Sequence, residues 1–186
     1  MGSLEIRIAG FGGQGVILAG MVIGRAATIY DSKHVTLTQS FGPEARGSAC
    51  SVQLIVSPEP VLYPYLTHPD ILVAMSQEAY TRFVSGLKPN GVLIYEQDLI
   101  EMDSRHAEVK AYGVPATRFA EELGRKLVLN MVMVGYVTGL TGIITPDAAR
   151  KSIADSVPKG TESLNTSAFE KGLEYALSLS ATQLSA

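Results

Sequence analysis

The residues best suited to chemistry lie in one glycine-rich stretch near the start of the chain. Gly10, Gly12 and Gly15 follow the spacing G-x-G-x-x-G after an apolar run, and a helical pattern begins directly behind them. Glycines permit a sharp turn and the close approach of a phosphate, and the free N–H groups at the start of a helix attract anions. The stretch therefore predicts a binding loop at the carboxyl end of a first strand.

Three interpretations of this loop remain open. A dinucleotide site would place an acidic residue at the end of the second strand, but that strand is predicted to end in Thr38-Gln39, and Asp31 precedes it. Gly13 and Gln14 also depart from the dinucleotide fingerprint. The loop could instead only pack helix on sheet, or it could contact an anion or a partner in a larger assembly. A P-loop is excluded because no Gly-Lys-Ser or Gly-Lys-Thr follows.

The second candidate is Arg46, within the glycine-flanked segment 42–47. This segment follows the predicted second strand, so we expect it near the first loop, at the edge where open α/β sheets bind ligands. The guanidinium group of Arg46 can hold a phosphate or a partner's carboxylate. The alternative is a turn in which Glu44 and Arg46 pair with each other or face water.

The rest of the chain carries no recognisable catalytic apparatus. Cys50 reads as a small buried residue of a strand, and the sequence offers no base to activate it. His34, His68 and His106 are scattered, without metal-ligand spacing. No G-x-S-x-G elbow is present. We expect neither catalytic residues nor a metal site.

The elements that must position these residues are strands and helices in the first part of the chain and helices only in the last part. After the first strand and a helix at 14–30, strands are predicted at 34–38, 51–56, 70–75, 91–95 and 107–112, with a helix at 77–87, and then helices at 117–126, 127–144, 146–157 and 163–179. This pattern predicts a Rossmann-like three-layer α/β fold with a mostly parallel sheet and C-terminal helices. We expect a single domain over 1–186, with an α/β sheet part at 1–114 and a mainly helical part at 115–186.

Composition excludes several classes of function. The net charge of −3 argues against sequence-independent nucleic-acid binding. One cysteine excludes a disulfide framework and an iron–sulfur cluster ligated by this chain alone. The cysteine usage and the lack of a signal-peptide pattern predict a cytoplasmic protein.

The chain is unusually apolar, with 46% hydrophobic residues, and residues 127–144 carry no charge. Asn130, Thr138, Thr141 and several glycines in that run argue against a membrane span. We expect a helix buried on all sides, in the core or against a partner, in which Asn130 fixes a neighbouring loop. Of the two explanations for the apolar composition, a large core or a face covered by another chain, we favour the second. It predicts a homodimer of the isolated chain through its apolar helices.

Taken in order, these motifs resemble the gamma subunit, or gamma domain, of the 2-oxoacid:ferredoxin (acceptor) oxidoreductases. The resemblance rests on Gly10-Phe11-Gly12-Gly13-Gln14-Gly15-Val16 and on Gly42-Pro43-Glu44-Ala45-Arg46-Gly47, and it extends to residues 70–74, to Asn130 with Gly135, and to residues 165–172. It covers nearly the whole chain. Ser48 stands where the family usually has a second glycine after the arginine, which leaves the geometry of that loop open.

The resemblance implies a function that the residues alone do not. Such enzymes decarboxylate a 2-oxoacid oxidatively with coenzyme A, yielding an acyl-CoA, carbon dioxide and low-potential electrons. Alpha and beta subunits hold thiamine diphosphate, and iron–sulfur clusters sit in the beta or delta subunits. The gamma part completes the complex and helps receive coenzyme A, which assigns Gly12, Gly13, Gln14, Gly15 and Arg46 to cofactor binding. The size of the chain most resembles the 2-oxoglutarate type; pyruvate and branched-chain types, and a free-standing nucleotide-binding oxidoreductase, are the alternatives.

Overall fold

A six-stranded sheet with the strand order β2-β3-β1-β4-β5-β6 forms the centre of the computed structural model, which describes residues 2–41 and 49–183. The strands are β1 (Leu4–Phe11), β2 (His34–Phe41), β3 (Ala49–Ser57), β4 (Ile71–Ala74), β5 (Val92–Glu96) and β6 (Lys110–Val114). β3 is antiparallel to both of its neighbours, β1 and β2, and the other pairs are parallel. Five strands therefore run in one direction, which confirms the prediction of a mostly parallel sheet.

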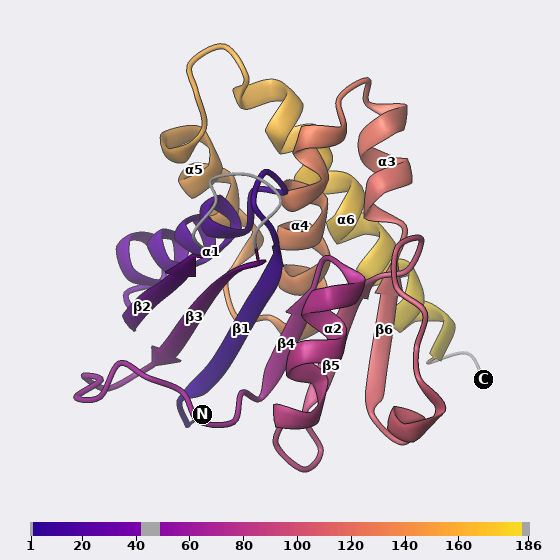
Figure 1. Ribbon diagram of the computed structural model, residues 1–186. Helices are drawn as coiled ribbons and strands as arrows, with labels where there is room; N and C mark the ends of the chain where they lie inside the picture. Colours follow the sequence, from indigo (N-terminus) through magenta and orange to yellow (C-terminus); the bar gives the residue numbers. More distant parts are fainter. Residues whose placement is uncertain (1, 42–48, 184–186) are drawn as a thin grey trace.

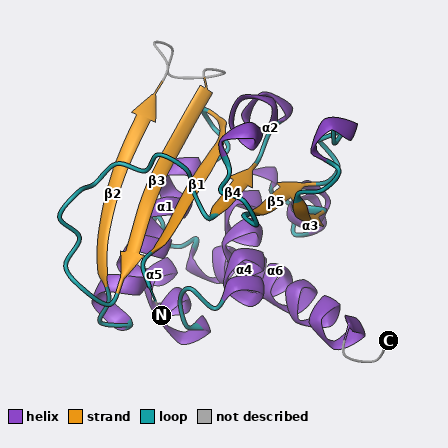
Figure 2. Ribbon diagram, turned by 90° about the horizontal axis from the view of Figure 1, so that it is seen from below, coloured by secondary structure: helices purple, strands orange, loops and turns teal. Residues whose placement is uncertain are grey.

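Helices cover both faces of this sheet, which makes three layers (Figure 1). They are α1 (Val16–Arg25), α2 (Gln77–Phe83), α3 (Ala116–Glu122), α4 (Leu129–Thr141), α5 (Pro146–Ser156) and α6 (Glu162–Gln183), with short turns η1 (Ala26–Tyr30), η2 (Val84–Gly86), η3 (Ser104–His106) and η4 (Lys126–Val128). The larger core joins the sheet to α1, α3, α4, α5 and α6, and a smaller core joins β4 and β5 to α2. Figure 2 shows the long helices gathered on one side.

Several boundaries differ from the sequence prediction. The helix expected at 14–30 begins at Val16, because Gly15 has a left-handed backbone and caps it, and it widens into a π-helical turn after Arg25. The strand expected at 107–112 lies at Lys110–Val114, because residues 107–109 form the turn that follows η3. The strand expected at 34–38 continues to Phe41, pairing with β3 along its whole length.

The uncharged helix α4 is enclosed by the chain itself. Gly135 and Gly172 lie where α4 crosses α6, and a Cβ added at either would sit 2.0 Å from a backbone oxygen of the other helix. All residues from Leu129 to Thr138 are buried. Of the two positions expected for this helix, in the core or against a partner, the structure therefore shows the core. Within residues 2–41 and 49–183, no helix is both long and apolar enough to cross a membrane.

Candidate functional site

The glycine loop connects the end of β1 to the start of α1 in four residues. Gly13 and Gly15 have φ angles of +105° and +73°, which side-chain-bearing residues rarely adopt. The Gln14 N–H donates to the Phe11 carbonyl over 3.1 Å and closes the turn. Gly15 is the residue before the first turn of α1, so the loop ends at the positive pole of that helix.

The side chain of Gln14 holds the loop in place. Its Oε1 accepts a hydrogen bond from the Phe11 N–H at 2.7 Å, and its Nε2 donates to the Met75 carbonyl at 2.7 Å. The loop is thereby tied to the residue that follows β4. Gly10 leaves the space for this arrangement, because a Cβ there would lie 2.5 Å from Gln14 Oε1. Gln14 therefore positions the loop, and its amide is already engaged.

Asn130 supports the loop from beneath. It is 3% exposed at the start of α4, its Nδ2 donates to the Gly15 carbonyl at 3.3 Å, and its Oδ1 accepts from the Met131 N–H at 3.0 Å. The expectation that Asn130 fixes a neighbouring loop is confirmed. A Cβ at Gly15 would lie 2.3 Å from Asn130 Nδ2, so this contact requires a glycine there as much as the backbone angle does.

The outer side of the loop is open. Gly13 is exposed, and a Cβ at Gly13 would meet no atom within 4 Å. The first turn of α1 contains no acidic residue that would compete with an anion. Backbone N–H groups at the start of a helix, behind a loop without side chains, suit a phosphate group. The open space at Gly13 leaves room for such a group on the outer side of the loop.

Arg46 lies outside the described residues, as do the other residues of segment 42–48. The described residues on either side of it are Phe41, which pairs with Cys50, and Ala49, which pairs with Phe11. Phe41 and Ala49 therefore lie at the end of the sheet where the glycine loop begins. The role of Arg46 remains a prediction.

The remaining candidates have structural surroundings. Asp31 accepts hydrogen bonds from the N–H and Oγ1 of Thr145, each at 2.7 Å, and so supports the start of α5. It precedes β2, at the end opposite the glycine loop, as the argument against a dinucleotide site requires. Cys50 is buried in β3, and burial raises the pKa of its thiol. Within the described part of the chain, no group of three or more His, Cys, Asp or Glu residues is placed to hold a metal ion.

Sequence reasoning missed Glu96, a fully buried carboxylate at the end of β5. One of its oxygens accepts from the Asp98 N–H at 2.9 Å, and the other accepts from the Thr117 N–H at 2.6 Å and from Thr117 Oγ1 at 2.9 Å. Desolvation by burial raises the pKa of Glu96 despite these bonds. The carboxylate joins β5 to the start of α3. Its place at the end of an apolar strand was visible, but its partner 21 residues away was not.

Known proteins match this chain over most of its length. The family described as pyruvate ferredoxin/flavodoxin oxidoreductase matches residues 5–175. The chain is 48% identical over 177 residues to 2-oxoglutarate synthase subunit KorC of Methanocaldococcus jannaschii, covering 94% of this chain and 95% of that protein.

Two solved structures share the fold. The gamma subunit of a keto/oxoacid ferredoxin oxidoreductase from Geobacter sulfurreducens superimposes with a TM-score of 0.82 at 36% identity, over 94% of this chain and 99% of the other. The 2-oxoglutarate:ferredoxin oxidoreductase of Magnetococcus marinus was solved with 2-oxoglutarate, coenzyme A and succinyl-CoA bound. It superimposes with a TM-score of 0.87 at 27% identity. That match covers 96% of this chain and 32% of the larger one.

Proposed function

Because the chain belongs to the pyruvate ferredoxin/flavodoxin oxidoreductase family, as a gamma-type subunit, we propose that it serves an enzyme that converts 2-oxoglutarate and coenzyme A into succinyl-CoA and carbon dioxide. Within that complex, the glycine loop contacts coenzyme A. The supporting observation is the loop itself, held by Gln14 and Asn130 with an open backbone at Gly13. The bound coenzyme A and succinyl-CoA of the Magnetococcus marinus relative are consistent with this assignment.

The remaining chemistry belongs to partner chains in this proposal. Alpha and beta subunits hold thiamine diphosphate, a beta or delta subunit holds iron–sulfur clusters, and the electrons leave to an iron–sulfur protein. Gly12, Gly13, Gln14, Gly15 and Arg46 shape or line the coenzyme A contact. The complex is cytoplasmic, and the isolated chain is inactive. Pyruvate and branched-chain 2-oxoacids are the alternative substrates, and turnover of the purified complex with each acid separates them.

Replacing Gly13 by aspartate tests the coenzyme A contact. An aspartate there adds a negative charge beside the proposed phosphate position and strains a φ angle of +105°. We expect the KM for coenzyme A to rise by about tenfold or more in the assembled complex, since this corresponds to the loss of one charge-assisted contact. The KM for 2-oxoglutarate should change little.

Gly124→Asp is the matched control. Gly124 also has a positive φ angle, +85°, with no atom within 4 Å of an added Cβ. This variant carries the same strain and the same charge away from the loop, so it should leave the KM for coenzyme A unchanged. Equal KM values for the Gly13→Asp complex and the unaltered complex would contradict the proposed contact. Tight binding of NAD, NADP or FAD by the chain alone, measured by calorimetry, would favour the free-standing oxidoreductase instead.

We also propose a homodimer for the isolated chain, through the sheet edge rather than through α4. β2 is an edge strand without a charged residue from Val35 to Phe41, and such edges readily pair with another strand. Met21 and Ile29, beside it, are 41% and 56% exposed. Analytical ultracentrifugation at micromolar concentrations should give the mass of a dimer. A monomer over the whole concentration range would contradict this proposal.

A further inference from the structure

The connection between β3 and β4 is longer than the sheet requires. β3 ends and β4 begins at the same end of the sheet, and β1 is the one strand between them. Two strand spacings amount to about 10 Å, which roughly three or four extended residues can cover. The chain instead uses residues 58–70, without a helix or strand among them. Loops of this length are uncommon in compact domains and usually serve a function.

This loop is anchored to the rest of the protein. The Leu66 N–H donates to Gln53 Oε1 of β3 at 3.3 Å, and the Asp70 N–H donates to the Glu5 carbonyl of β1 at 2.8 Å. The Leu66 side chain is buried. Proline fixes its own φ angle, and the loop contains four prolines: Pro58, Pro60, Pro64 and Pro69. A loop held in this way loses little conformational freedom when it binds a partner.

Three large apolar side chains of the loop stand in solvent. Leu62 is 95% exposed, Tyr63 67% and Tyr65 59%. The two tyrosine rings meet edge to face, with their centroids 5.7 Å apart. No Asp, Glu, Lys or Arg stands between Glu59 and Asp70. We call Leu62, Tyr63 and Tyr65 the apolar cluster, a preformed group of a kind that soluble chains rarely leave uncovered without a partner to bind.

The loop lies at the end of the sheet opposite the glycine loop. Figure 1 shows it reaching outward from the end of β3 at the lower edge of the sheet, and in Figure 2 it passes in front of β2, β3 and β1. The glycine loop follows the other end of β1. The apolar cluster is therefore separate from the proposed coenzyme A contact.

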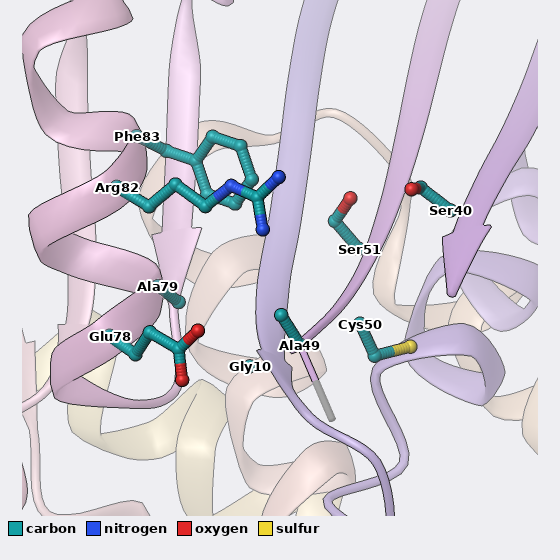
Figure 3. A pocket seen from close by; sticks show the side chains of 9 residues that line it. All are labelled: Gly10, Ser40, Ala49, Cys50, Ser51, Glu78, Ala79, Arg82 and Phe83. Atoms are coloured by element: carbon teal, nitrogen blue, oxygen red, sulfur yellow. The ribbon is translucent and has the colours of Figure 1, made fainter. Parts of the chain in front are cut away.

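The sheet beside the loop leaves little room for a ligand. On the side of β3 away from the larger core, Ser51 and Ile55 are buried. The hollow next to α2, shown in Figure 3, measures about 30 Å³, and Glu78 and Arg82 of α2 already border it. That space holds little more than water. Apolar surface for a partner is offered by the apolar cluster and not by the strands beside it.

The size and charge of the apolar cluster favour a different protein chain as its partner. The loop carries no Lys or Arg that would attract anionic lipids or nucleic acid. Its three side chains offer at most roughly 500 Å², so two copies paired through them would bury about 1,000 Å², below the ~1,200–2,000 Å² of a stable dimer. Tyrosine is enriched at the centres of interfaces, where it fills pockets of the partner.

We propose that the apolar cluster inserts into an apolar recess of another subunit of the oxidoreductase complex. This rests on the proposed function, because it requires that the chain work within a complex. Leu62 and the two rings fill the recess, and the tyrosine hydroxyls donate to acceptors at its rim. In the Magnetococcus marinus relative, the part that matches this chain makes up 32% of the polypeptide, so there the fold is joined to further parts of the same chain.

The double variant Leu62→Ser, Tyr63→Ser in the reconstituted complex tests the docking contact. Both side chains are exposed, so the variant should fold, and association with the remaining subunits should weaken by roughly 30-fold or more, measured by interferometry. Tyr63→Phe keeps the ring and should lose much less. Leu177→Ser is the matched control, since Leu177 is an exposed apolar residue on α6, outside the loop. It should assemble normally.

The KM for coenzyme A of the double variant, once assembled at high subunit concentration, should equal that of the unaltered complex. If the double variant assembles as tightly as the unaltered chain, the docking inference is overturned while the proposed function stands. If the unaltered chain fails to assemble with thiamine-binding subunits, the proposed function itself fails. Normal assembly of the double variant with a raised KM for coenzyme A would assign the loop to that ligand and overturn the docking role.

Two measurements on the isolated chain cover the other occupants. Analytical ultracentrifugation compares self-association of the unaltered chain and the double variant, and co-sedimentation with vesicles of phosphatidylcholine and phosphatidylserine tests a membrane. Neither should differ between the two proteins. Loss of self-association or of vesicle binding in the double variant, with normal assembly of the complex, would assign the apolar cluster to a second copy or to a lipid surface and overturn the docking inference.

Discussion

Replacing Gly135 by alanine is expected to lower the melting temperature of the chain by roughly 6–12 °C, from a loss of about 3 kcal/mol in the free energy of unfolding. The added Cβ would lie 2.0 Å from the Phe169 carbonyl oxygen and 2.9 Å from the Leu173 nitrogen. Both are backbone atoms of α6, so they cannot move aside as a side-chain end would. The helices must separate, and the buried face of α4 loses its packing. Circular dichroism during heating measures the effect.

Gly24→Ala in α1 is the matched control, and we expect it to stabilise the chain. The nearest atom to a Cβ there, Leu54 Cδ2, is 3.5 Å away, which is an ordinary contact. Alanine is a better helix former than glycine, so this variant should gain up to about 1 kcal/mol. A melting temperature of Gly135→Ala within about 2 °C of the unaltered chain would contradict the close crossing of α4 and α6.

Replacing Asn130 by alanine should impair both stability and coenzyme A use. The change removes the hydrogen bonds to Gly15 and Met131 and leaves a space beneath the glycine loop. We expect a loss of about 2 kcal/mol in the free energy of unfolding, because buried backbone groups lose their partners. We also expect a several-fold rise in the KM for coenzyme A, because the loop is no longer held in its left-handed turn.

Asn165→Ala separates the two effects. Asn165 is also a buried asparagine, and its Nδ2 donates to the carbonyl and the hydroxyl of Thr161, at the start of α6. Its loss should lower stability to a similar degree without a change in the KM for coenzyme A. If the two asparagine variants show the same KM, the link between Asn130 and ligand binding is wrong.

Much of this site could be predicted from local sequence. Glycine permits the positive φ angles found at Gly13 and Gly15, and the loop between a strand and a helix follows from the change in hydrophobic period. The need for a partner at Asn130 was also predictable, because a polar group in an uncharged helix must be satisfied. The identity of that partner could not be predicted, because the Gly15 carbonyl, to which Asn130 donates, is 115 residues away in the chain.

The features that could not be predicted from the sequence depend on contacts between segments that are distant in the chain. The small residues of α4 indicated a close helix contact, but whether the second helix belonged to the same chain could not be read from spacing. Arg7 of β1 and Arg82 of α2 both lie over the Phe83 ring, because the fold brings α2 beside β1. About 75 residues separate the two arginines in the chain. Neither arginine stands in a motif. Such groups arise from the strand order, which the hydrophobic pattern does not encode.

The crossing of α4 and α6 also sets the order in which the newly made chain can mature. The sheet residues through β6 are synthesised first, and α4 follows, yet its glycine face stays uncovered until Gly172 and the rest of α6 have emerged. At ordinary rates of translation this interval lasts on the order of a few seconds. During that time an uncharged helix is accessible to chaperones and to other nascent chains. Loss of the last helix would make this exposure permanent, so truncation there should send the protein to degradation rather than to assembly.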